Sequence, residues 1–161
     1  MNDKPHPGVR KTLSPKEARI KASRFCAYQE RSQQQVRDKL YDYGLKGNEV
    51  EEVLSDLIVH GFINEERFAR SYVRGKFRIK KWGRKKILQG LKQHQISDYC
   101  IRKGWEEINE EEYNKTLHIL LEKKAGTLKA INPALQRSKI ASYLIGRGFE
   151  SDLVWTAVNG I

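Results

Sequence analysis

Lysines and arginines are the residues of this sequence whose types and spacing most directly indicate a binding site. Between Arg67 and Ser97 there are eleven lysines and arginines and no aspartate or glutamate. The chain has 31 basic and 20 acidic residues, so removing these eleven leaves 20 of each sign. Guanidinium and ammonium groups bind carboxylates and phosphates. A single basic block in an otherwise balanced chain therefore predicts a surface for an anionic partner.

The basic residues are densest between Arg74 and Lys86, where they occupy eight of thirteen positions. Spacings of three and four residues predict a stripe of positive charge along one helix from Arg67 to Lys81, with further lysines on an adjoining face. The predicted partner- or DNA-binding residues are Arg67, Arg70, Arg74, Lys76, Arg78, Lys80, Lys81, Arg84, Lys85 and Lys86, with Trp82 as an aromatic contact.

Opposite this stripe, Phe68, Phe77 and Ile79 are expected on the buried side of the helix. Three basic residues in the first turn of the next helix oppose its dipole, each by a few tenths to about 1 kcal/mol. This local cost favours a binding role over a solvated surface with no specific partner. Nucleic-acid phosphates and an acidic or nucleotide-bearing protein surface both fit, and composition does not separate them. Trp82 fits either a stacking platform for a base or a buried residue that closes the helix.

Catalytic and metal chemistry have little support in the sequence. The four histidines are isolated from one another, and no glycine-rich phosphate loop occurs. The glutamate clusters fall near expected helix ends, where they act as dipole partners or solvated faces. Cys26 and Cys100 match no disulfide framework or zinc motif, so both are expected to be buried thiols in a reducing compartment. We therefore predict a protein that is not an enzyme and has no cofactor or metal.

The N-terminal residues 1–13 lack the apolar core of a signal peptide and are expected to form a mobile tail. No run of the chain approaches the roughly 18 apolar residues that a membrane span needs. The sequence therefore predicts a cytoplasmic protein without a membrane partner. We also expect the protein to be a monomer.

Helix start signals recur along the chain and place the basic block within a helical protein. Pairs of a capping residue and a polar residue three positions later begin at Ser14, Ser32, Asn48 and Asn109. Apolar residues between them recur at spacings of three and four, and sustained alternation is absent. The predicted fold class is all-α, with helices at about residues 15–29, 32–43, 48–60, 64–81, 84–94, 97–107, 110–126, 133–146 and 151–160.

A longer period groups these helices in threes. Six apolar positions recur at an interval of 51 residues and again at 53. We therefore predict three tandem three-helix repeats at residues 14–62, 63–108 and 109–161, forming an elongated body that can curve. Gly44 and Gly148 occupy matching positions and are expected to end the middle helix in a left-handed turn, whereas Gln95 in the second repeat weakens that expectation. The matched positions are Val36, Leu40, Leu45, Val50, Leu54 and Leu57, then Ile87, Leu91, Ile96, Ile101, Trp105 and Ile108, then Ile140, Leu144, Phe149, Val154, Val158 and Ile161.

Four stretches together resemble the RecX family of bacterial regulatory proteins. They are RSQQQVRDKL at residues 31–40, GFINEERFARSYV at 61–73, KWGR at 81–84 and YLIGRGFESD at 143–152. The likeness covers about residues 15–161. The chain departs from the family pattern at Gln35 and at Asn64, and both substitutions keep the capacity to cap a helix.

The resemblance implies a non-enzymatic inhibitor of the RecA recombinase that binds in the groove of the RecA–DNA filament. Members of the family restrain ATP hydrolysis, filament extension and strand exchange. On this hypothesis the basic block contacts DNA phosphate, acidic groups of the recombinase, or both. The alternative is a helical module that binds single- or double-stranded nucleic acid directly.

Overall fold

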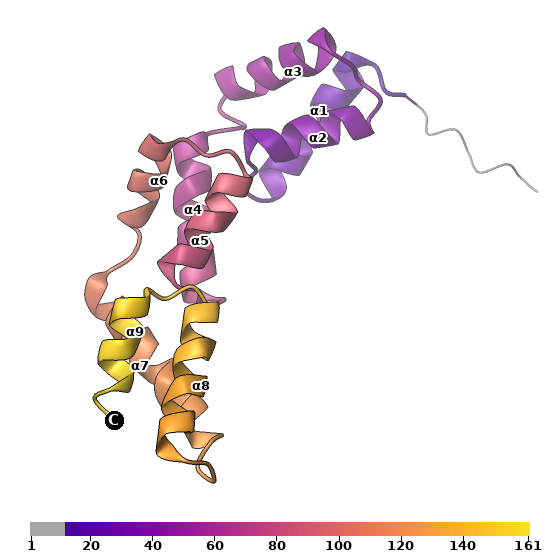
Figure 1. The fold of residues 1–161 in the computed structure, drawn as a ribbon. Helices are drawn as coiled ribbons and strands as arrows, with labels where there is room; N and C mark the ends of the chain where they lie inside the picture. The colour runs from indigo at the N-terminus through magenta and orange to yellow at the C-terminus, as the bar shows by residue number, and fades with distance from the viewer. Residues whose placement is uncertain (1–11) are drawn as a thin grey trace, which may run out of the picture. The chain divides into compact units, whose positions relative to one another are not determined.

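The computed structural model describes residues 12–161, which form nine α-helices and no strands (Figure 1). This confirms the predicted all-α class, and every predicted helix is present. The helices are α1 (Pro15–Tyr28), α2 (Gln33–Asp42), α3 (Asn48–Val59), α4 (Glu65–Arg78), α5 (Arg84–Gln93), α6 (Asp98–Trp105), α7 (Glu110–Gly126), α8 (Pro133–Gly146) and α9 (Ser151–Val158).

Most helix starts follow the predicted capping chemistry. Ser14 and Ser32 each form a capping box with the Glu or Gln three residues later. The Asn109 side chain accepts a hydrogen bond from the backbone N–H three residues on. The prediction for Asn48 is wrong, because Gly47 is the N-cap of α3 and no side chain caps this end. Gly47 takes a positive φ of 49°, a backbone conformation that glycine adopts readily.

The middle helix of each repeat ends in the same left-handed turn. The turn residue has a φ of 93° at Gly44, 57° at Gln95 and 101° at Gly148. In each case the N–H of the following residue donates to a carbonyl of the last helical turn, which is the Schellman arrangement. The second repeat therefore keeps the turn although it lacks the glycine. The residues that follow the turn are the third periodic position of each repeat, Leu45, Ile96 and Phe149.

The helices group into two compact units, one ending at Phe68 and one running from Ala69 to Ile161. In the first unit α1, α2 and α3 pack against one another around a core that includes Leu40, Leu54 and Leu57. Leu13 packs on this core and donates a backbone hydrogen bond of 2.9 Å to Tyr43, although it lies in the segment predicted as a tail. Residues 1–11 of that predicted tail lie outside the described residues.

The second unit contains the second repeat from Ala69 onwards and the whole third repeat. Gly90 and Gly104 lie where α5 and α6 approach α4, and a Cβ on Gly104 would lie 2.9 Å from a methyl group of Val73. In the third repeat α7, α8 and α9 pack side by side (Figure 1). All the periodic apolar positions are buried except Trp105, which is half-buried, and Ile161, which is 58% exposed. Ile161 lies beyond the last residue of α9, so its predicted burial is wrong.

Candidate functional site

The basic block begins on α4, which ends at Arg78 rather than at residue 81. The helix closes through backbone hydrogen bonds from Lys81 to Phe77 and from Trp82 to Lys76, both of 3.1 Å. Lys81 has a φ of 57° and reverses the chain direction. Ile79 follows the last residue of α4, two positions after the buried Phe77 and so on the opposite side of the helix. It is 79% exposed, so its predicted burial is wrong, while Phe77 is buried as expected.

The segment Ile79–Gly83, called the basic loop below, is held against the turn between α8 and α9. Gly83 donates a backbone hydrogen bond of 2.8 Å to the Arg147 carbonyl. The Arg147 guanidinium donates in return to the carbonyls of Lys80 and Lys81. A Cβ on Gly83 would overlap the backbone of Gly148, so this close approach requires glycine. The third repeat therefore fixes the position of the basic loop.

Arg84, which follows the loop, is part of a partly buried network that joins the second and third repeats. Its backbone N–H donates to the Tyr113 hydroxyl over 3.1 Å, and this hydroxyl donates to Glu150 over 2.7 Å. The guanidinium pairs with Glu150 and Glu110 and lies 4.0 Å from the centre of the Tyr113 ring. Burial, together with the hydrogen bond to Glu150, raises the pKa of the Tyr113 phenol. Arg84 thus has a structural role within the fold.

Two arginines of the predicted stripe also have carboxylate partners in their own chain. Arg70 pairs with Glu106 at 2.7 Å and with Glu107 at 3.5 Å, and Arg74 pairs with Glu107 at 3.3 Å. The hydrogen bond from Arg70 is the main cause that lowers the pKa of the Glu106 carboxyl. These pairs join α4 to the end of α6, so part of the charge of Arg70 and Arg74 is neutralised locally.

Arg67 has a similar arrangement within the first unit. Its guanidinium pairs with Glu30 at 2.5 Å and donates a hydrogen bond of 2.9 Å to the Gly61 carbonyl. With Arg70, Arg74 and Arg84, four of the ten predicted binding residues therefore form ion pairs within the chain.

The Trp82 ring contacts two lysines of the block that form no ion pair within the described residues. The ammonium groups of Lys76 and Lys86 lie 4.8 and 4.5 Å from the centre of its indole ring. Such contacts are favourable because the face of the ring carries negative charge density. Trp82 is half-buried, and its ring contacts two lysines of its own chain.

Seven basic side chains of the block have no carboxylate partner among the described residues, and we call them the basic surface. All lie in the second unit, and one of them, Lys92, was missed because it is separated from the densest run. Its spacing of seven residues from Lys85 could have identified it, because this spacing puts both on one face of a helix. The basic surface consists of Lys76, Arg78, Lys80, Lys81, Lys85, Lys86 and Lys92.

Groups suited to metal binding or nucleophilic chemistry do not gather elsewhere in the described part of the chain. No three His, Cys, Asp or Glu residues between positions 12 and 161 lie close enough together to hold a metal ion. Cys26 is buried, and burial raises the pKa of its thiol. None of the described helices is both long enough and apolar enough to cross a membrane.

Three family models match the chain in order, one for each repeat. They are described as the first, second and third three-helix domains of RecX and match residues 18–57, 64–104 and 110–158. The chain belongs to the RecX family. The three matches confirm that the three-helix units are arranged in tandem.

Proteins named RecX from several bacteria are similar to most of this chain. A "Regulatory protein RecX" from Streptococcus uberis is 32% identical over 84% of this chain and 52% of its own length. Another, from Herminiimonas arsenicoxydans, is 27% identical over 87% of this chain and 89% of its own length. The chain therefore spans about half the length of some RecX relatives and most of the length of others.

Two solved RecX structures share the fold. The crystal structure of RecX from Lactobacillus salivarius superimposes with a TM-score of 0.80 at 24% identity, covering 91% of this chain and 95% of that one. A crystal structure titled regulatory protein RecX gives a TM-score of 0.82 at 22% identity, covering 91% of this chain and 73% of that one. At these identities the likeness establishes the arrangement of helices within the RecX fold.

Proposed function

We propose that this RecX-family chain is a non-enzymatic inhibitor of the RecA recombinase that acts as a monomer in the cytoplasm. It binds in the groove of the RecA–DNA filament and restrains ATP hydrolysis, filament extension and strand exchange. The single observation that carries the proposal is the basic surface. Seven positive side chains that have no carboxylate partner within residues 12–161 lie in one unit, on helices and a loop held by contacts with the third repeat.

The basic loop is held in place by the third repeat, and this supports binding to an ordered assembly. Backbone hydrogen bonds and close glycine contacts hold the basic loop, so little conformational entropy is lost when it meets a partner. A filament presents a repeated pattern of acidic protein groups and DNA phosphates. If the chain binds one filament state more tightly than another, that difference in affinity stabilises the first state and slows the cycle.

Direct binding to nucleic acid is the second candidate, and the composition of the basic surface favours it. Six of its seven members are lysines, which bind phosphate as point charges without the paired geometry of arginine. If all seven contacted single-stranded DNA, the log–log dependence of affinity on salt would have a slope of about −5.

The test is the effect of the chain on the DNA-dependent ATPase activity of RecA. Arg78→Glu, Lys81→Glu and Lys85→Glu, combined in one variant, reverse three exposed charges of the basic surface. The matched control combines Lys16→Glu, Lys115→Glu and Lys123→Glu, which reverse exposed lysines on α1 and α7.

We expect the unmodified chain and the control to inhibit the ATPase, and the basic-surface variant to need at least about tenfold more protein for the same inhibition. Absence of inhibition by the unmodified chain would refute the proposed function. Equal inhibition by both variants would remove the basic surface from the mechanism.

A further inference from the structure

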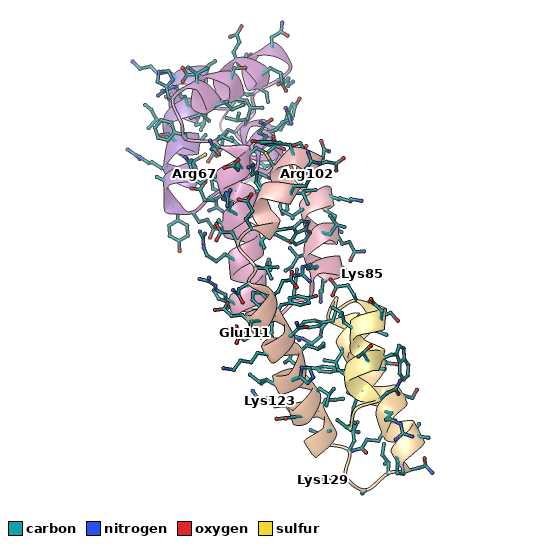
Figure 2. The ribbon with its side chains drawn as sticks, turned by 90° about the vertical axis from the view of Figure 1, so that its left-hand side faces the viewer. Arg67, Lys85, Arg102, Glu111, Lys123 and Lys129 are labelled. Carbon is teal, nitrogen blue, oxygen red and sulfur yellow. The ribbon has the colours of Figure 1, made fainter. Side chains whose placement is uncertain are left out.

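A groove in the second unit lies between α5 and the C-terminal end of α8. It has a volume of about 510 Å3. Lys85, at one end of its α5 wall, lies beside the helices of the third repeat in Figure 2. The lining residues are Lys85, Lys86, Leu88, Gln89, Lys92, Ile145, Gly146 and Gly148.

The lining combines positive charge with an apolar floor. Three ammonium groups border the groove, and none of its lining residues carries a carboxylate. Leu88 and Ile145 add aliphatic surface, and Ile145 is 39% exposed. Exposed aliphatic surface between uncompensated charges fits a ligand that is both anionic and apolar.

The chemistry of the lining distinguishes between a nucleic acid and a protein. Strand-binding grooves stack bases on aromatic rings, and this groove has no aromatic lining residue. A short peptide uses all of the lining, because its aliphatic side chain covers Leu88 and Ile145 while its carboxylates meet the lysines.

Backbone contacts join the two walls of the groove. Lys85 donates a backbone hydrogen bond of 2.9 Å to the Gly148 carbonyl, which ties the start of α5 to the turn after α8. A Cβ on Gly148 would lie 2.6 Å from the Lys86 backbone nitrogen, so the two walls are in direct contact. A preformed groove binds a short segment at a lower entropic cost than a surface that must rearrange.

We infer that this groove binds a short acidic segment of the recombinase protein, with an aliphatic residue on Leu88 and Ile145 and carboxylates at Lys85, Lys86 and Lys92. The inference rests on the proposed function, because the segment belongs to the RecA protein of the filament. It assigns the groove to the protein component of the filament rather than to its DNA.

Photo-crosslinking from inside the groove tests this assignment. Gln89 is exposed and lines the groove, so a benzophenone amino acid is placed there in one variant. In the control it replaces Glu111, an exposed residue of α7 (Figure 2). Each variant is irradiated with RecA assembled on single-stranded DNA, and co-sedimentation with the filament is measured in parallel.

We expect an adduct from position 89 on an acidic segment of RecA, at a yield well above that from position 111. An adduct mainly on DNA would overturn the inference, as would the absence of any adduct from a variant that still co-sediments with the filament. If the unmodified chain does not co-sediment with the filament, the proposed function itself fails.

Charge reversal provides a second measurement. Combining Lys85→Glu with Lys92→Glu changes two groove lysines, and combining Lys115→Glu with Lys123→Glu applies the same change of net charge on α7. We expect the groove variant to bind the RecA filament at least about tenfold more weakly than the control variant. Both variants should bind bare single-stranded DNA equally. Equal filament affinities, or a loss confined to bare DNA, would overturn the inference.

Discussion

Gly148 ends α8 in a left-handed conformation and lies directly against the start of α5. The substitution Gly148→Ala tests both the left-handed conformation and the contact with α5. Its φ of 101° is unfavourable for a residue with a Cβ, and the added carbon would press on the backbone of Lys86 and Gly83. Gly44, at the matching position of the first repeat, has a φ of 93°, but the three atoms nearest to its Cβ would all belong to the side chain of Thr12 rather than to backbone. Gly44→Ala is therefore the matched control.

The expected loss of stability follows from these two contributions. A left-handed residue with a Cβ costs about 1–2 kcal/mol, and overpacking against backbone costs about 1–3 kcal/mol. Alanine also restricts the unfolded chain, which offsets about 0.4–1 kcal/mol. We therefore expect Gly148→Ala to lower the free energy of unfolding of the second unit by about 2–4 kcal/mol, and Gly44→Ala to lower that of the first unit by about 1 kcal/mol.

Urea unfolding followed by tryptophan fluorescence separates the two effects. The chain has three tryptophans, at positions 82, 105 and 155, and all lie in the second unit. With a typical dependence of about 2 kcal/mol per molar urea, Gly148→Ala should lower the fluorescence midpoint by about 1–2 M. Gly44→Ala should leave this midpoint unchanged and alter only the helical signal in circular dichroism.

A fluorescence midpoint that moves by less than about 0.3 M in Gly148→Ala would refute the reasoning, because even the backbone conformation alone would cost more. Equal losses in the two glycine variants would show that the contact with α5 adds nothing.

Three further predictions concern single side chains of the second unit, each measured by urea unfolding. Tyr113→Phe removes the hydroxyl that binds both the Arg84 amide and Glu150, so it should destabilise the unit by about 1–3 kcal/mol; an unchanged midpoint would mean that these bonds contribute nothing. Gln95→Gly should stabilise the unit by about 0.5–1 kcal/mol, because glycine relieves the left-handed turn, and a loss of stability would contradict this explanation. Burial, and to a smaller extent the charge of Lys76, hold the pKa of His94 in the folded chain below its ordinary value. As the pH falls below about 6.5, His94 therefore binds a proton in the unfolded chain before it does so in the folded chain, which favours unfolding. Stability should therefore decrease between pH 7 and 5.5, and His94→Gln should reduce that decrease; an identical decrease in the variant would exclude His94 as its source.

Much of the fold was predictable because its signals are local. Capping boxes at Ser14 and Ser32 and the periodic apolar residues depend on neighbours within one or two helical turns. The errors occur where backbone conformation outweighs residue preference. Gly47, with a positive φ, takes the N-cap position predicted for Asn48, and α4 ends at Arg78, before a left-handed Lys81, with Ile79 exposed. Gln95 shows the reverse case, in which the packing of the repeat imposes a turn that the residue does not favour.

The site was less predictable because charge pairing depends on tertiary contacts. The sequence shows a block without acidic residues, but the carboxylates that pair with four of its arginines are Glu30, two glutamates just after α6, one in α7 and one before α9. These glutamates lie 26 to 66 residues from their partners. Arg147, which holds the basic loop, is equally distant, and no local pattern connects it to that loop. The sequence predicts the total charge of the segment, whereas the structure shows which of its basic side chains pair with carboxylates of the chain.

The most direct test of the regulatory role compares two dissociation constants at the same salt concentration. One is for binding to single-stranded DNA coated with RecA, and the other is for binding to the same DNA without protein. A filament-binding regulator should bind the coated DNA at least about tenfold more tightly, a difference of about 1.4 kcal/mol. Equal or tighter binding to bare DNA, with a salt slope near about −5, would contradict this role and identify the chain as a nucleic-acid-binding module.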